Sequence, residues 1–452
     1  MWTHTLSDVT EAIWSHSMNV RSRQRSTLAA AALVATAITV LAGCAASNSP
    51  SPSGSADGGF TEEQIATGVE YTGGTAEAAD SSLEPVKIGF INVDGGVPSF
   101  PESTDAAQVA AQFVNEHLGG IDGHPVEVVQ CSIVQGDEDG QKCAQQFAND
   151  ESILSIQLGM TIFGTGPIYS TIGQSKVITG QGTFTPIDLD NPGVSVYEGA
   201  AYSTGPSVVL YADQFLDAKS IAVVYPGEDA GALGAVQTIT NVAKEYDIDV
   251  TSVPVSDDSQ WSAALLSAGA QSADAIVMSG STPKCVPFGQ AVDQLALTAP
   301  VMVFGFCQDA SVAEAFGDYP KWTYINPLKS PIGVDQPDVE LYGAVMAAYS
   351  PETNVGGGAS GTFQMIISQV RAMNAIGYDN LTVDTIRDEI ANFSGPLFLG
   401  PPTIECGQFA DLGAQSLCNT TGFPITYEGD DVWTDPTDGE GLDVGGLALE
   451  TR

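Results

Sequence analysis

Basic side chains are scarce in this chain of 452 residues, which has 14 Lys and Arg against 55 Asp and Glu and a net charge of -41. Nucleic acids and anionic lipid surfaces repel so negative a protein, and we expect neither as a partner. An acidic surface also keeps an exported protein soluble, so acidity alone predicts no cationic ligand.

Histidine is rarer still, with four residues, and no Cys-x-x-Cys pair occurs. Zinc sites need closely spaced Cys and His ligands, so we expect no metal. The Gly-x-Ser-x-Gly elbow, the phosphate-binding loop and the His-Glu-x-x-His helix are also absent from the sequence. The sequence therefore predicts neither an enzyme nor a bound cofactor.

The apolar run over residues 28–43 is 16 residues long, shorter than the roughly 20 residues of a membrane-spanning helix. It follows Arg21, Arg23 and Arg25, as in a signal peptide. Its ending, Leu41-Ala42-Gly43-Cys44, resembles the lipobox of bacterial lipoproteins. That resemblance implies cleavage before Cys44, a diacylglycerol on its thiol and further acylation such as palmitate, which anchors the protein on the extracytoplasmic face of the cell membrane. Acidic residues upstream make Met18 an alternative start.

Six further cysteines fall into three near-neighbour pairs. In an exported protein their oxidation is the default, although six cysteines allow 15 connectivities. A disulfide that closes so short a loop stabilises a fold by roughly 3 kcal/mol in the chain-entropy model. The sequential pairing is Cys131 with Cys143, Cys285 with Cys307, and Cys406 with Cys418.

The rest of the chain alternates short apolar runs with amphipathic stretches. Strands are predicted at 86–91, 126–130, 153–158 and 177–179, and after a break near residue 192 the pattern restarts with strands at 220–225, 249–254, 275–278 and 301–304. Strand-helix alternation of this kind indicates parallel sheets covered on both faces. We therefore expect an α/β protein with two Rossmann-like lobes joined by a multi-strand hinge.

The predicted organisation has five parts. A signal peptide at 1–43 precedes a lipidated Cys44 and a flexible linker to residue 83, which is rich in Ser, Gly, Ala and Pro. The first lobe takes residues 84–200 and 335–395, the second takes 201–334 and 396–435, and a loosely held acidic tail covers 436–452.

Three segments carry a resemblance to type I periplasmic binding proteins, specifically to the Leu/Ile/Val-binding branch of ABC-transporter solute-binding components. They are the strand and Gly-Gly-Ile-Asp-Gly element over 86–123, the second-lobe opening over 219–234, and the strand and loop over 273–280. The resemblance implies two lobes that close on a small solute, and it implies permease and ATPase subunits as partners. We expect the protein to be a monomer.

Solutes bind beyond the carboxyl ends of parallel strands, which singles out two loops of the first lobe. Thr165 is predicted to cap a helix, and the resemblance implies that a hydroxyl there, on Thr165 or Thr161, binds the solute's carboxylate; a plain cap is the alternative. In the next loop the resemblance implies solute contacts from Gly182, Thr183, Phe184 and Thr185. Lower-ranked neighbours of the pocket are Asn92, Asp94, Phe100, Phe306 and Gln308.

The second lobe departs from the family's amino-acid binders. Ala230 stands where the family has an aromatic residue, and Lys284, after Ser281, stands where the family has an acid. A lysine cannot pair with an ammonium group, so we hypothesise an anionic or amide-type solute with Lys284 as its counter-charge. The alternatives are a solvated Lys284 and an amino-acid solute paired with Glu228 or Asp229.

These observations predict a substrate-binding lipoprotein of an ABC importer for a small polar solute of amino acid, amide or carboxylate type. The alternative is a receptor lipoprotein that binds the same class of solute and signals to a membrane sensor.

Overall fold

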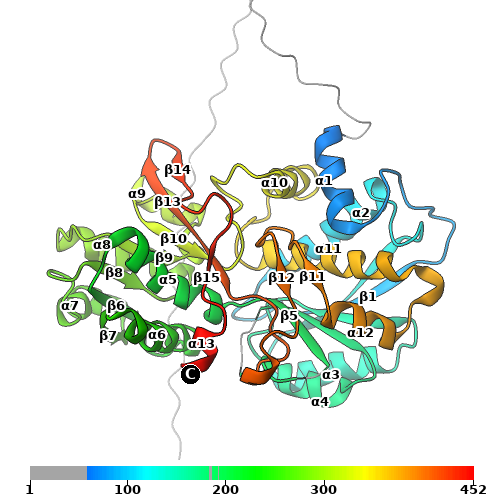
Figure 1. Cartoon of the computed structure of the whole chain (residues 1–452), viewed down its shortest axis with the longest axis horizontal. Coiled ribbons are helices and arrows are strands. Elements are labelled where there is room, and N and C mark those ends of the chain that lie inside the picture. Colours follow the sequence, from blue (N-terminus) through cyan, green and yellow to red (C-terminus); the bar gives the residue numbers. More distant parts are fainter. Residues whose placement is uncertain (1–58, 183–185, 192, 452) are drawn as a thin grey trace, which may run out of the picture. The chain divides into compact units, whose positions relative to one another are not determined.

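Five parallel strands form the first of two large sheets (Figure 1), and a small third sheet pairs β11 (Ser394–Gly395) with β12 (Ile404–Glu405). The computed structural model describes residues 59–182, 186–191 and 193–451, all within one compact unit, Ser53–Arg452. Side chains alternate across the sheet, so Ile88 and Phe90 enter one core and Ile91 and Val93 the other. The strands are β1 (Val86–Val93), β2 (Val126–Ile133), β3 (Ile153–Leu158), β4 (Val177–Gly182) and β5 (Val194–Glu198), in the order β2-β1-β3-β4-β5.

Helices cover both faces of this sheet, as expected for parallel strands that are buried on both sides. On one face Phe113 of α2 and Phe363 of α11 share a core with Ile88, and on the other Phe147 of α3 and Ile168 of α4 pack against Ile91. The helices of this first lobe are α1 (Glu62–Thr72), α2 (Pro101–His117), α3 (Asp137–Ala148), α4 (Thr165–Ile172), α10 (Pro337–Tyr349), α11 (Gly358–Ile376) and α12 (Val383–Ala391).

The second sheet contains five parallel strands and an antiparallel extension at one side. Its order is β14-β13-β10-β9-β8-β6-β7, and β15 also pairs with β13. Its strands are β6 (Ser220–Pro226), β7 (Asp249–Val255), β8 (Ala275–Met278), β9 (Val301–Phe304), β10 (Thr323–Asn326), β13 (Thr421–Gly429), β14 (Val432–Thr434) and β15 (Leu442–Asp443).

This sheet is also covered on both faces. Ile221 packs with Val208 of α5 and Ile239 of α6, whereas Ala222 packs on the other face with Trp261 of α7 and Phe288 of α8. The helices of this second lobe are α5 (Ala201–Leu216), α6 (Ala230–Ala243), α7 (Trp261–Ser267), α8 (Thr282–Gln294), α9 (Ala310–Phe316) and α13 (Leu447–Glu450). Short 3-10 turns occupy Pro186–Asp188, Lys244–Tyr246, Asp258–Gln260, Gly305–Cys307, Tyr378–Asn380 and Ala410–Leu412.

The chain passes between the two sheets three times. The first crossing is Gly199–Ala200 between β5 and α5, and the second is the segment 327–336 between β10 and α10. The third precedes β13, where Leu417 forms a parallel bridge with Val196 of β5. Between α10 and α11, Asn354 Nδ2 also donates to Asp309 Oδ2 of the second lobe at 3.0 Å.

Three segments differ from the sequence-based expectations. The predicted linker contains α1, because Thr61 and Gln64 form a reciprocal capping box and Phe60 and Ile65 are buried. Residues 397–404 pack on the first lobe rather than the second, since Leu397 and Phe398 enter the core beside α11 and α12. Further along, Phe409 and Leu417 pack with Leu449 of α13. The predicted loose tail instead supplies β15 and α13, with Ala448 and Leu449 buried.

The three disulfides join the sequential pairs that the spacing predicts. The Cα–Cα distances are 5.6 Å for Cys131–Cys143, 5.5 Å for Cys285–Cys307 and 4.2 Å for Cys406–Cys418. Within the described residues no helix combines the length and the apolar character that a membrane crossing requires.

Candidate functional site

The first turns of α11 meet the carboxyl ends of the first sheet's strands, and two glycines make this approach possible. A Cβ atom at Gly358 would lie 2.3 Å from Ser103 Oγ of α2 and 2.6 Å from Met160 Cγ after β3. A Cβ atom at Gly361 would lie 2.8 Å from Glu198 Oε2 of β5. Side chains from α2, the loop after β3, and β5 therefore reach α11 at these two glycines, which have no side chain.

A buried hydrogen-bond network fixes the strand ends against α11. Thr362 Oγ1 donates to Gln181 Oε1 at 2.5 Å, and Gln181 Nε2 lies 2.8 Å from Met160 Sδ. Gln157 Nε2 donates to the Thr362 carbonyl at 3.0 Å. Because these groups are buried and mutually bonded, they hold the ends of β3 and β4 in one geometry.

Asn92 shapes the loop after β3 from the end of β1. Its Oδ1 accepts from the Met160 backbone N–H at 3.0 Å, and its Nδ2 donates to the Phe100 carbonyl at 2.7 Å. Asp94 accepts from Thr104 Oγ1 at 3.0 Å. Asn92 is fully buried, so it positions the loop, and of these predicted wall residues only Phe100 and Asp94 have partly exposed side chains.

Glu198, at the carboxyl end of β5, is the residue of this cluster that the sequence analysis did not identify. Its side chain is 6% exposed, and burial raises the pKa of its carboxyl to about 8. Among the described residues its carboxyl has no hydrogen-bond or ion-pair partner. Burial likewise raises the pKa of Glu102, whose Oε1 approaches Gly358. The sequence signal that could have indicated it is an acid at the end of the short strand Val194–Glu198.

The predicted first-lobe ligands are partly placed. Thr161 and Thr165 are buried beside β3 and at the first position of α4, and Gly182 is the last residue of β4. The prediction that Thr165 caps this helix is wrong: the cap is Gly164, whose φ of 80° suits glycine, and no side chain bonds there. Thr183, Phe184 and Thr185 lie outside the described residues.

The predicted second-lobe ligands are dispersed along the ends of β6 and β8. Asp229 Oδ1 caps α6 by accepting from the Ala232 N–H at 3.0 Å, and Glu228 is exposed. Ser281 precedes α8 and is exposed. Lys284 Nζ donates to Asp258 Oδ1 at 2.8 Å. The charge of the predicted counter-ion is therefore balanced within its own lobe.

A small pocket of about 100 Å³ adjoins this ion pair. The buried Trp261 lines it, and the indole Nε1 has no partner among the described groups. Beside Trp261 the lining is Pro226, Glu228, Val255, Ser256, Asp257, Asp258 and Lys284. This volume is below the roughly 300–1,000 Å³ that is typical of small-molecule sites.

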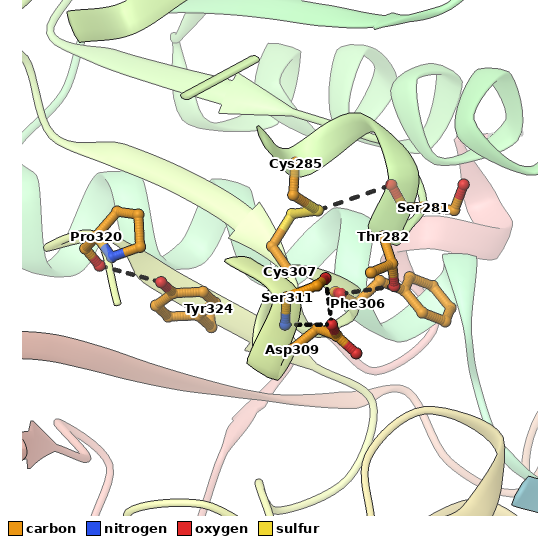
Figure 2. The surroundings of a disulfide bond; sticks show 9 residues. All are labelled: Ser281, Thr282, Cys285, Phe306, Cys307, Asp309, Ser311, Pro320 and Tyr324. Carbon is orange, nitrogen blue, oxygen red and sulfur yellow. Dashed lines mark hydrogen bonds between the residues drawn. A yellow bond between two sulfur atoms is a disulfide. The ribbon is translucent and has the colours of Figure 1, made fainter. Parts of the chain in front are cut away.

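The Cys285–Cys307 disulfide joins α8 to the turn after β9 (Figure 2). Thr282 Oγ1 donates to the Phe306 carbonyl at 2.9 Å, which makes a second link between the same segments. Phe306 is 40% exposed, whereas Gln308 is buried and its Nε2 donates to the Ile332 carbonyl of the second crossing at 3.2 Å. Gln308 thus ties the strand end to the crossing.

Two α/β lobes with polar loops at the strand ends, joined by three crossings, define the class of two-lobed solute-binding proteins. No cluster of His, Cys, Asp or Glu that could hold a metal ion occurs among the described residues. Residues 85–409 match the periplasmic binding protein family, and the chain belongs to that family. It is accordingly a binding protein and not an enzyme.

Solved structures share this fold at low sequence identity. A leucine-binding protein from Thermotoga maritima has a TM-score of 0.62 and 16% identity over 78% of this chain and 99% of its own. A fatty acid ABC transporter substrate-binding protein from Thermomonospora curvata has a TM-score of 0.63 and 15% identity over 83% of this chain and 96% of its own. A solute-binding protein from R. palustris in complex with benzoate has a TM-score of 0.57 and 14% identity over 80% of this chain and 96% of its own. No curated protein sequence matches the chain.

Proposed function

We propose that this chain is the substrate-binding lipoprotein of an ABC importer and captures a small polar solute between its lobes by domain closure. The observation that carries the proposal is the pair of parallel sheets joined by three crossings in a member of the periplasmic binding protein family. Ligand then favours the closed arrangement by its differential affinity, and a permease reads that arrangement.

The solute class we favour is the amino acid type. The name of the T. maritima protein gives leucine as its ligand, whereas the R. palustris protein holds benzoate. Because Asp258 already balances Lys284, an anionic solute has lost the counter-charge that the sequence offered it. Replacing Lys284 with Met should therefore leave solute affinity within about twofold of the wild-type value. A loss larger than tenfold would support an anionic solute that pairs with Lys284.

Solute binding itself is tested by identifying what the purified protein retains, using native mass spectrometry. A thermal-shift panel of amino acids, amides, carboxylates, fatty acids and benzoate follows. A solute at 100 times its Kd stabilises the folded state by about 2.7 kcal/mol, which a melting curve resolves. A protein that retains nothing and responds to nothing in the panel would contradict solute binding.

The membrane anchor is proposed from Cys44 and the residues before it, which lie outside the described part. Labelling of cells with radioactive palmitate should mark the wild-type protein, and Cys44→Ala should abolish the label and release the protein from the membrane. Neighbouring genes for permeases and ATPases would support import, whereas a neighbouring sensor kinase would support signalling instead.

A further inference from the structure

Glu198 closes β5 at the edge of the first sheet where the solute loops begin. In the ladder of β4 and β5 it pairs with Gly182, the residue that immediately precedes the predicted solute loop 183–185. Glu198 therefore lies next to the start of the predicted solute loop, and its side chain is 6% exposed.

The surroundings of Glu198 leave its carboxylate without compensation. Gln181, the nearest polar side chain of β4, is occupied by Thr362 and Met160. On α11 the facing residue is Gly361, which supplies neither a donor nor a charge. An isolated buried carboxylate is costly, and an unpaired one in a native fold requires an explanation.

A second unpartnered group lies on the adjoining segment. Leu417 bridges Val196, and the Cys418 N–H donates to the Val196 carbonyl at 2.9 Å, so two residues further along each segment come Asn419 and Glu198. Asn419 is 3% exposed, and its Nδ2 has no partner among the described groups. Its Oδ1 accepts from the Thr421 N–H at 2.9 Å. The two segments stay close at this level, since a Cβ atom at Gly199, the residue after Glu198, would lie 2.6 Å from the Asn419 carbonyl oxygen.

We propose that Glu198 binds the protonated amine of the solute, and that Asn419 donates to an oxygen beside that amine, so the solute class is small amines with a neighbouring oxygen, such as amino acids. The inference rests on the proposed function. An ammonium group supplies the donors and the charge that the carboxylate lacks, and charge-assisted bonds of this kind are the stronger ones. The assignment places amine recognition in the first lobe, apart from the second-lobe positions that the sequence suggested.

Binding of an amine then releases a proton. Free Glu198 is protonated below its pKa of about 8, and the bound ammonium requires the carboxylate. Apparent affinity for an amine therefore rises about tenfold per pH unit up to about pH 8 and levels off above it. Of the described groups nearest Glu198, Gln181, Gly361 and Asn419 do not titrate; Glu102 is the acid that approaches the same end of α11, beside Gly358.

The experiment uses the full chain, purified in detergent, and isothermal titration with L-leucine and three matched pairs. The pairs are 3-methylbutylamine with 4-methylpentanoate, benzylamine with benzoate, and hexylamine with hexanoate, each at pH 6.0, 7.0 and 8.5. We expect leucine or at least one amine to bind, with affinity rising with pH. Glu198→Gln should weaken that binding at least tenfold at pH 8.5 and abolish the pH dependence. As a control, Glu245→Gln removes an exposed second-lobe acid and should change neither the affinity nor its pH dependence.

Each remaining outcome counts against the inference. If only carboxylates bind, the solute class is wrong and solute binding stands. If leucine or an amine binds Glu198→Gln and wild type equally, a buried water satisfies Glu198 and the assignment fails, again without touching the proposed function. Circular dichroism and thermal melting of Glu198→Gln test whether the variant is folded, which excludes misfolding as the cause of lost affinity. Asn419→Ala should independently lower the affinity for leucine at least fivefold. If none of the compounds gives a heat of binding, the inference about Glu198 fails, whereas solute binding is decided by the retained ligand and the thermal-shift panel.

Discussion

The ion pair between Lys329 and Asp338 is buried where the second crossing enters α10. Lys329 Nζ lies 3.0 Å and 3.3 Å from the two carboxylate oxygens, and the side chains are 10% and 3% exposed. Asp338 also accepts from the Leu399 N–H at 2.9 Å and the Val339 N–H at 3.1 Å. Three segments of the chain are therefore tied to one carboxylate.

Asp338→Ala should lower the free energy of unfolding by about 3–5 kcal/mol, because it leaves a buried ammonium without a counter-charge. Asp338→Asn keeps an oxygen that can accept from Leu399 and should cost less than Asp338→Ala. The matched control is Asp258→Ala at the more exposed pair with Lys284, where the cost should be about 0–1 kcal/mol.

The measurement is equilibrium urea unfolding followed by far-UV circular dichroism, at low salt and in 0.5 M NaCl. Salt should reduce the difference in free energy of unfolding between wild type and Asp258→Ala. It should leave the difference between wild type and Asp338→Ala unchanged, since buried charges are weakly screened. Equal losses from Asp338→Ala and Asp258→Ala would refute the argument that burial makes the Lys329 pair the more costly one to break.

Three further perturbations follow from the fold. Gly358→Ala should lower the free energy of unfolding by about 1–3 kcal/mol, since its methyl would meet Ser103 Oγ at 2.3 Å. Gly343→Ala in α10, with nothing within 4 Å, should raise it by up to about 1 kcal/mol. Thermal melting of both variants tests whether the two changes have opposite signs. Replacing Cys131 and Cys143 with Ser opens a 12-residue loop and should cost about 3 kcal/mol in urea unfolding, and no loss would contradict the loop-closure account. Glu198 takes up a proton on folding, so wild-type stability should fall from about pH 4.5 to about pH 8, and the Glu198→Gln melting curve should lack that fall.

The parallel strands were the most predictable part of this fold. The run predicted at 153–158 is β3, and those at 275–278 and 301–304 are β8 and β9, because strands buried on both faces are continuous apolar runs. The edge and hinge strands β5, β10 and β13 were missed. They mix polar and apolar residues, and their pairing is set by distant segments, which a local pattern does not report.

Helix starts are hard to locate from the sequence where glycine, proline or a polar cap begins the helix. The helix α11 begins at Gly358 and α8 begins at Thr282, before the apolar residues that carry the helical periodicity. The helix α1 was missed altogether because its surroundings are rich in Ser, Gly and Ala, although Thr61 and Gln64 formed a readable capping box. Local composition outweighed a specific signal that spans only four residues.

The charged residues of the site show why sequence position alone misjudged solute recognition. Lys284 attracted attention because cations are rare in this chain, yet the same acidic excess makes a nearby carboxylate the expected partner of any lysine, and Asp258 fills that role. The informative residue is then the acid that finds no partner. Glu198 is buried in a chain of net charge -41, where exposed positions for a glutamate are plentiful. Its desolvation cost is offset only when something outside the described residues brings a donor or a positive charge to it, and a solute amine does both.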